Sequence, residues 1–365
     1  MNSLIINKAD LINNINVIKN MLKNNEKIIA VVKGNGYGLD LVKYSKILIE
    51  NGIQMLAVAN IDELIRLRKA GIKEEILVLS STCISQEIAD IIENKGILTI
   101  GSTAAAELAN EIARSMNKNI KVHLKIDTGM GRYGYLYQNI DEIELSIKTN
   151  KNLVFDGIYS HFSLAYNKSS KFTKTQYERF INVLKELEKR GYVFNLRHIC
   201  NSSGFIYNPN MYLNGVRLGT AFLGRIQNSN ELGLKRIGKI ESQISEIKEL
   251  PKNYFVGYLS SYKTRKPTKL AIIPVGYMAG FNMCKNTDTF RFVDFLRNEK
   301  NLLKENIKRE KLKVNINGKQ YDVIGKVGMY DLKIDITDSD IKIGDKAYLD
   351  VNTLYVDSLI DRKYE

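Results

Sequence analysis

Several residue types are scarce in this chain of 365 residues, and each scarcity argues against a class of protein. The three cysteines, Cys83, Cys200 and Cys284, lie far apart and form no CxxC pair, which argues against a disulfide framework and a structural zinc site. No run reaches the roughly 18 apolar residues of a membrane span, and the N-terminus lacks the apolar segment of a signal peptide. We therefore expect a cytoplasmic protein in a reducing compartment, with no metal and no membrane contact.

The chain carries a net positive charge that is not concentrated in any one segment. Lys and Arg number 54 against 40 Asp and Glu, which gives a formal net charge of +14, and the basic residues are spread along the whole chain. The sequence has no basic block interleaved with aromatics, no zinc-finger spacing and no RNP-like signature. We expect a solvated surface and no nucleic-acid partner, and keep nucleic-acid or membrane-surface binding as the alternative class.

Short β-branched runs alternate with helical patterns from Lys27 to about Arg225. The runs start with IIAVVK and continue through MLAVA, ILVL, ILTI, IKVHLKI, VFDGIY and FNLRHI to GVRLG. Eight strands that are too apolar to be half exposed predict an α/β protein with a (β/α)8 TIM-type barrel. An open doubly wound sheet is the alternative, although no GxGxxG opens a helix after the first strand.

The pattern changes after about Leu232 to strands with charged turns, such as KLAIIPVGY and KAYLDV. This change predicts a C-terminal mainly-β domain. We expect residues 1–232 to form the barrel and residues 233–365 to form the second domain. A charged amphipathic segment at about 288–311 predicts a helical insertion in that domain, at the surface or an interface.

Lys33 follows the first barrel strand and opens the glycine-rich run KGNGYG. Gly34, Gly36 and Gly38 can adopt positive φ and let the main chain approach a ligand, while Tyr37 offers a hydroxyl. A lysine presented in this way can form a Schiff base with a carbonyl group. A solvated turn lysine is the ordinary alternative.

Other candidate residues follow the later strands, where a barrel collects its chemistry. They are Arg132 in KIDTGMGRYG, His161 in YSHF, Ser202 and Ser203 in CNSSG, and Arg217 in GVRLGT. Taken singly, His161 has an ordinary explanation as a core histidine, and an arginine near a turn has one as a surface ion pair. Together with the lysine, two arginines and a group of hydroxyls and amides suited to a phosphate indicate a phosphorylated aldehyde cofactor, which is pyridoxal 5'-phosphate.

The motifs AVVKGNGYG, KIDTGMGRYG, HFS, NSSG, VRLG and PVGY, in this order, resemble those of the alanine racemase family of fold-type III enzymes. The resemblance covers nearly the whole chain. It implies an isomerase that racemises alanine and supplies D-alanine for cell-wall peptidoglycan. The cofactor residues that it implies are Lys33 as the covalent attachment, Tyr37, Ser202, Gly219 and Thr220 at the phosphate, Arg217 at the pyridine nitrogen, Arg132 facing the phenolic oxygen, and His161. His198 and Lys125 match supporting residues, and Lys125 matches a lysine that some members carry as a carbamate.

The resemblance also implies a second base from the β domain. Tyr258, in GYLSSYK, matches the catalytic tyrosine that reaches the partner subunit's active site, so the expected unit is a homodimer with shared sites. Racemisation removes the α-proton from one face and returns a proton on the other, which requires two opposed bases. Lys33 and Tyr258 would fill these roles, with His161 and Arg217 supporting the tyrosine.

Departures from the family pattern concern the substrate. GYMAGF keeps Tyr277 but has Ala279 where the family has an acidic residue, and VGMYDL keeps Met329 but has Tyr330 in place of an aspartate. The substrate-binding residues that the resemblance implies are Arg132, Tyr277 and Met329.

Either Asn352 or Tyr355 takes the place of the family's tyrosine near the last strand. An amide at that place would favour a hydroxymethyl side chain, as in serine racemases that resemble vancomycin-resistance enzymes. Alanine is therefore the first expectation and serine the second. A non-catalytic protein that binds the same cofactor is the alternative from another class, and the β domain with Tyr258 argues against it.

Overall fold

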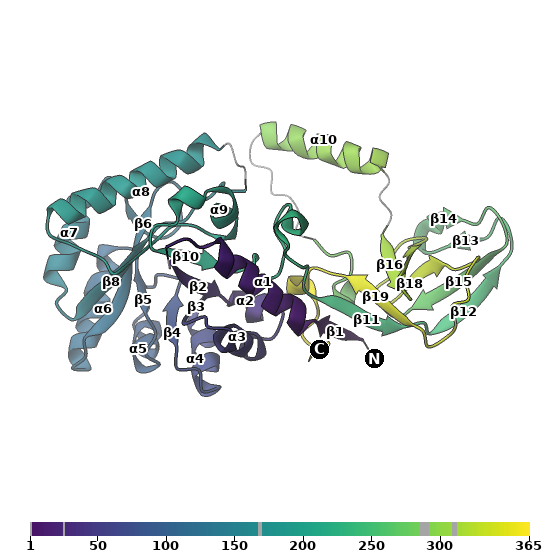
Figure 1. The fold of residues 1–365 in the computed structure, drawn as a ribbon, viewed down its shortest axis with the longest axis horizontal. Coiled ribbons are helices and arrows are strands. Elements are labelled where there is room, and N and C mark those ends of the chain that lie inside the picture. The colour runs from purple at the N-terminus through teal and green to yellow at the C-terminus, as the bar shows by residue number, and fades with distance from the viewer. Residues whose placement is uncertain (1, 25, 167–169, 285–291, 309–311) are drawn as a thin grey trace. The chain divides into compact units, whose positions relative to one another are not determined.

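The computed structural model describes residues 2–24, 26–166, 170–284, 292–308 and 312–365. The chain separates into two compact units (Figure 1). One unit is Ala9–Ile237, and the other combines the N-terminal residues up to Lys8 with Gly238–Glu365.

The unit Ala9–Ile237 is a barrel of parallel strands (Figure 1). Its strands are hydrogen-bonded in the order β4-β3-β2-β10-β9-β8-β6-β5, and a parallel bridge between Leu77 and Ile97 joins the two ends. The TIM-type barrel is confirmed, and the open-sheet alternative is wrong. In the described part of this unit, the eight barrel strands are β2 (Lys27–Val31), β3 (Met55–Val58), β4 (Glu75–Val78), β5 (Leu98–Ile100), β6 (Ile120–Asp127), β8 (Leu153–Tyr159), β9 (Leu196–His198) and β10 (Gly215–Leu218), while the short β7 (Tyr135–Leu136) pairs with β6.

The apolar runs form strands because both of their faces are buried. All four residues of β3 are buried, and Met55 and Ala57 pack in one core cluster with Ile29 and Val31 of β2. These are alternate residues of neighbouring strands, as expected for side chains that fill a barrel, while the residues between them face the helices.

Helices cover the outside of the barrel, and polar side chains set where several of them begin. Asn60 accepts a hydrogen bond from Glu63 N, and Ser102 accepts one from Ala105 N. Asp40 accepts from Val42 N and Lys43 N, so the helix that follows begins at Leu41. The helices are α1 (Lys8–Met21), α2 (Lys33–Tyr37), α3 (Leu41–Glu50), α4 (Ile61–Lys69), α5 (Ser85–Glu93), α6 (Thr103–Ser115), α7 (Ile140–Thr149), α8 (Lys171–Lys189) and α9 (Ser202–Tyr207), with 3-10 turns η1 (Pro209–Met211) and η2 (Ser229–Leu232).

The second unit is mainly β, as predicted. One sheet has the order β17-β16-β19-β11-β1-β20, a second has the order β12-β15-β18, and β13 pairs with β14. The strands are β1 (Ser3–Ile6), β11 (Lys239–Gln243), β12 (Glu246–Leu250), β13 (Phe255–Val256), β14 (Tyr262–Lys263), β15 (Thr268–Ile273), β16 (Lys313–Ile316), β17 (Lys319–Asp322), β18 (Leu332–Asp335), β19 (Lys346–Asp350) and β20 (Asp361–Tyr364), with 3-10 turns η3 (Tyr258–Ser260), η4 (Tyr277–Ala279) and η5 (Thr353–Tyr355).

The first strand corrects the division expected at residues 1–232 and 233–365. β1 pairs in antiparallel fashion with β11 and in parallel with β20, so the chain begins inside the β unit and not in the barrel. The barrel also runs on to Ile237. A strand of four residues carries no sign of which sheet will accept it, because its partners lie more than two hundred residues away.

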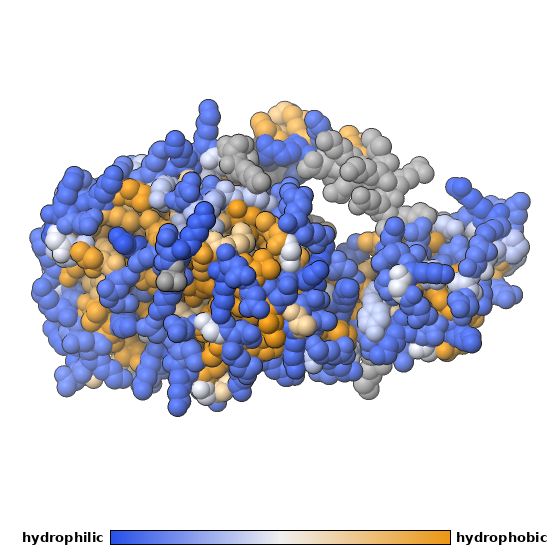
Figure 2. Space-filling model, viewed as in Figure 1, coloured by the Kyte–Doolittle hydropathy of each residue, from blue (hydrophilic) through white to orange (hydrophobic). Residues whose placement is uncertain are grey.

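The helical insertion predicted at 288–311 contains α10 (Phe292–Lys308), while 288–291 and 309–311 lie outside the described residues. Figure 2 shows hydrophilic residues over most of the visible surface, with hydrophobic residues scattered among them. Among the described residues, no helix is both long enough and apolar enough to cross a membrane.

Candidate functional site

A cavity of about 450 Å³ lies at the C-terminal ends of the barrel strands. Its walls bring together side chains from loops that are up to nearly two hundred residues apart in the sequence. The cavity is lined by ten of the residues predicted from the sequence, which are Lys33, Tyr37, Lys125, Arg132, His161, Ser202, Ser203, Arg217, Gly219 and Thr220.

The loop after Lys33 forms a left-handed turn. Gly34, Asn35 and Gly36 have φ of 65°, 53° and 66°, and Tyr37 and Gly38 also have positive φ. Gly38 N donates to Gly34 O at 2.9 Å, which closes the turn. The positive φ predicted for the glycines is present, and Asn35 and Tyr37 share it at a steric cost that glycine does not have.

Glu63 holds this turn in place, although it is not among the residues predicted from the sequence. Its Oε1 accepts from Gly34 N at 2.6 Å and Asn35 N at 3.2 Å, and its Oε2 accepts from Ala59 N at 2.9 Å. The residue is only 7% exposed, so a buried carboxylate is satisfied by three main-chain donors. Glu63 therefore fixes the direction in which Lys33 leaves the barrel strand.

The Lys33 amine projects into the open cavity. The surrounding walls still remove enough water to lower its pKa, and the positive charges of Arg132 and, more weakly, Arg217 act in the same direction. Glu63 opposes them by raising the pKa. The balance leaves the pKa of Lys33 below that of an ordinary lysine, which favours the neutral, nucleophilic amine.

Hydroxyls and main-chain amides meet at one end of the cavity. Ser202 Oγ accepts from Gly219 N at 3.0 Å and from Ala221 N at 3.2 Å. A Cβ added to Gly219 would lie 2.3 Å from Tyr37 Oη, so only glycine lets the tyrosine approach this strand end. Burial, with a smaller effect of Glu63, raises the pKa of Tyr37 to about 12, which keeps its hydroxyl a hydrogen-bond donor. The hydroxyl groups of Tyr37, Ser202 and Thr220 line this end of the cavity, and hydroxyl donors fit a phosphate group.

Arg217 is buried beneath the cavity with most of its donors occupied. Nη1 donates to His198 Nδ1 at 2.5 Å, while Nη2 donates to Ser160 O at 2.7 Å and to His161 Nδ1 at 3.0 Å. Nε has no partner within the described residues, and Arg217 lines the cavity. Burial lowers the pKa of Arg217 to about 10, so the group is still cationic at neutral pH. One charged N–H is thus left for an acceptor in the cavity, which fits a ring nitrogen.

Tyr159, which is not among the predicted residues, is one of the buried groups of this region. Its ring stacks on His198 with centroids 4.8 Å apart, and Lys125 Nζ lies 4.5 Å from the ring centroid. Burial, followed by the charges of Arg217 and Arg132, lowers the pKa of Lys125 well below that of an ordinary lysine. Both effects favour the neutral form of the Lys125 amine.

Asp127 shapes the turn that presents Arg132 and was also missed. Burial alone would raise its pKa, but four main-chain N–H groups outweigh this effect and lower it. The donors are Gly129 N at 2.7 Å, Met130 N at 2.8 Å, Gly131 N at 2.8 Å and Arg132 N at 3.1 Å.

Three predicted residues, Tyr258, Tyr277 and Met329, lie in the β unit and on its surface. Their exposed fractions are 67%, 44% and 42%. Tyr277 N donates to Gly328 O, and Met278 N donates to Met329 O, each at 3.1 Å, so these two loops lie side by side. The structure describes each unit by itself, and the roles of these residues toward the barrel cavity stay predictions.

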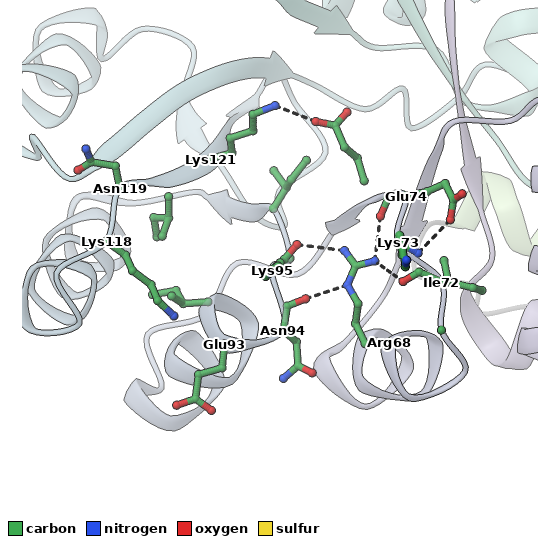
Figure 3. Close-up of a pocket in the computed structure, with 16 residues that line it drawn as sticks. Arg68, Ile72, Lys73, Glu74, Glu93, Asn94, Lys95, Lys118, Asn119 and Lys121 are labelled. Carbon is green, nitrogen blue, oxygen red and sulfur yellow. Dashed lines mark hydrogen bonds and ion pairs between the residues drawn. The ribbon is translucent and has the colours of Figure 1, made fainter.

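A larger cavity of about 880 Å³ lies at the opposite, N-terminal ends of the strands (Figure 3). Three of its charged groups make contacts that support the fold. Arg68 donates to four main-chain oxygens, and Lys121 pairs with Glu75. None of the predicted site residues lines it. In TIM barrels this face supports stability, and reactions take place at the other face, so the smaller cavity is the candidate site.

Comparison with known proteins agrees with this site. The family profile for the alanine racemase N-terminal domain matches residues 6–226, and that for the alanine racemase C-terminal domain matches residues 237–354. The chain belongs to the alanine racemase family. It is 32% identical over 349 residues to alanine racemase 2 of Caldanaerobacter subterraneus, which covers 94% of this chain and 84% of that protein. It is 34% identical to alanine racemase of Clostridium tetani, with 93% and 83% covered.

A solved structure of alanine racemase from Clostridium difficile has the same fold as this chain. Its TM-score is 0.85 at 28% sequence identity, and the match covers 100% of this chain and 95% of that one. Alanine racemases are isomerases that depend on pyridoxal 5'-phosphate, and this chain is an isomerase of that class. The amine of Lys33, the phosphate-suited donors and the remaining N–H of Arg217 fit that cofactor.

Proposed function

We propose that this protein interconverts L- and D-alanine in the barrel cavity, with Lys33 and Tyr258 as the two bases. The observation that carries the proposal is the convergence, in one cavity, of an amine of lowered pKa with donors for a phosphate and for a ring nitrogen. Membership of the alanine racemase family supports alanine as the substrate.

The cofactor, when bound, draws electrons from the α-carbon of the amino acid and so stabilises the charge left after its proton departs. Arg217 would donate an N–H to the ring nitrogen of the bound cofactor and would keep its own proton, because its pKa is lowered only to about 10. This contact would weaken the withdrawal of electrons and would favour proton exchange over transamination. The residues that would hold the cofactor are Lys33, Tyr37, Arg132, His161, Ser202, Arg217, Gly219 and Thr220, with His198 and Lys125 in support.

Lys33 supplies the base on one face of the substrate. A base must be unprotonated to accept the α-proton, and the lowered pKa of Lys33 raises the neutral fraction of its amine. Glu63 and the left-handed turn fix the loop on which this amine is carried.

Tyr258 supplies the base on the other face, from the partner subunit of a homodimer. It stands on the turn η3, where Leu259 has a φ of 56° and an exposed fraction of 83%. Tyr330 is 65% exposed as well. Large apolar side chains left exposed on neighbouring loops of one unit support a second copy of this chain as their partner.

Serine is not favoured as the substrate. The side-chain amide of Asn352 is the group expected to bind a hydroxymethyl side chain. In the structure, the Oδ1 of Asn352 accepts from Leu354 N at 3.3 Å and caps η5. The relatives are also named alanine racemases. We further propose that the enzyme is cytoplasmic and supplies D-alanine for peptidoglycan. We also propose that Lys125 Nζ, whose lowered pKa favours the neutral amine, bonds the carbon of CO2 and releases a proton to form a carbamate.

The proposal is tested by assaying the purified, cofactor-loaded protein with L-alanine and L-serine in parallel. We expect loss of optical rotation with alanine, much slower loss with serine, and borohydride labelling at Lys33 that is absent from Lys33→Ala. A colourless protein that racemises neither amino acid would overturn the proposal, and faster turnover of serine would overturn its substrate.

A further inference from the structure

All three histidines of the chain lie in one hydrogen-bonded group around Arg217. Arg217 Nη1 lies 2.5 Å from His198 Nδ1, and His198 Nε2 lies 3.1 Å from His123 Nδ1. A guanidinium only donates, so His198 Nδ1 must accept and its proton must be on Nε2. His198 Nε2–H then donates to His123 Nδ1, and His123 carries its own proton on Nε2. Arg217, as a donor at one end, and His123, as an acceptor at the other, therefore favour the same tautomer of His198.

The barrel is locally altered to accommodate His123. The side chain is fully buried, and its Nε2 has no hydrogen-bond partner within the described residues. A Cβ on the facing Gly157 would lie 2.5 Å from that nitrogen. The pairing of β6 with β8 also shifts at this point, because Val122 pairs with Phe155 and His123 pairs with Gly157. A glycine and a β-bulge thus make room for an imidazole whose outer N–H is left unsatisfied.

This arrangement is costly for stability, since a buried donor without an acceptor is worse than an apolar side chain of similar size. A leucine would fill the same space without an orphaned N–H. The role of the histidine is therefore carried by Nδ1, which accepts the hydrogen bond from His198 Nε2.

We infer that His123 is a positioning residue for Arg217. By accepting His198 Nε2–H, it holds His198 in the tautomer whose Nδ1 accepts from Arg217, and the guanidinium then keeps its remaining Nε–H directed into the cavity. Without this acceptor, the His198 proton can move to Nδ1, where it opposes the N–H of Arg217. The inference about catalysis rests on the proposed function, but the tautomers do not.

The first test uses the wild-type protein without cofactor or substrate. Its histidine nitrogens are labelled with nitrogen-15, and the spectrum should show each of the three rings neutral at neutral pH with its proton on Nε2. A charged ring, or an Nδ1–H form at His123 or His198, overturns the inference whether or not the protein is a racemase.

The second test compares His123→Leu, which removes the acceptor, with His123→Asn, whose Oδ1 can take the place of Nδ1. We expect His123→Leu to lower kcat at least about 10-fold with KM changed less than about 3-fold, and to give His198 a mixture of tautomers. His123→Asn should restore both the kcat and the His198 signal. Val122→Ala, a buried change on the opposite face of β6, controls for loss of packing and should leave the His198 tautomer unchanged. Equal behaviour of the Leu and Asn variants overturns the inference.

Discussion

Replacing Glu63 by glutamine is expected to loosen the loop that carries Lys33. The carboxylate has two acceptor oxygens, which together bind Gly34 N, Asn35 N and Ala59 N. Glutamine keeps only one of these oxygens and turns an NH2 group toward at least one main-chain N–H. Loss of one or two charge-assisted hydrogen bonds at a buried site corresponds to about 2–4 kcal/mol in the free energy of unfolding.

The assay is urea unfolding followed by far-ultraviolet circular dichroism, because the chain has no tryptophan for fluorescence. Asp62→Asn is the matched control, since Asp62 is the exposed neighbour of Glu63 in the first turn of α4 and loses the same charge. We expect the control to stay within about 0.5 kcal/mol of the wild type.

A second measurement follows the Lys33 amine itself. Glu63 raises the pKa of Lys33, so removing its charge should lower that pKa further and shift the pH midpoint of amine acylation, measured without cofactor, to lower pH. The explanation fails if Glu63→Gln unfolds at the same urea concentration as Asp62→Asn, or if the midpoint moves upward.

Three further predictions follow from the structure. Tyr258→Phe should slow exchange of the α-proton at least about 100-fold for one enantiomer of alanine and leave exchange of the other measurable, and full rates for both would exclude the second base. Gly219→Ala places a Cβ 2.3 Å from Tyr37 Oη and should weaken cofactor binding at least about 10-fold by equilibrium dialysis, whereas unchanged binding would exclude this phosphate site. Hydrogen bonds from Lys121 and Lys27 outweigh burial and lower the pKa of Glu75 from 4.5 to about 2, so the stability they add is present above pH 4.5 and is lost as pH falls toward 2. Because these groups are partly exposed, Glu75→Gln should remove only about 0.5–1 kcal/mol of that acid-sensitive stability in thermal melts, and an unchanged pH dependence would contradict the assignment.

The barrel could be predicted from the sequence because its strands must be apolar on both faces. Runs such as MLAVA and ILTI have no polar side for solvent, so only a covered parallel sheet accepts them. The candidate residues could be predicted for a related reason. Residues that follow such runs meet at one end of a barrel, and Lys33, Arg132, Ser202 and Arg217 do line one cavity.

The supporting groups could not be found in this way. Glu63 looks like an ordinary acidic residue in the first turn of a helix, and Asp127 looks like the last residue of a strand. Their importance comes from main-chain N–H groups that face them only after the loops have folded. One indication of these contacts is present in the sequence, which is the glycine content of the loops after Lys33 and Asp127. Glycine lets a loop turn several main-chain N–H groups toward one acceptor.

The sequence by itself determined the barrel, the β domain and the set of residues suited to the cofactor, because apolar periodicity and residue chemistry are local properties of the chain. Only the tertiary structure decided that β1 belongs to the β unit, that Lys33 stands on a left-handed turn held by Glu63, and that His123 faces Gly157 across a bulge. These features depend on contacts between distant segments, and the free energy of such contacts is set by burial and hydrogen-bond geometry that no single stretch of sequence contains.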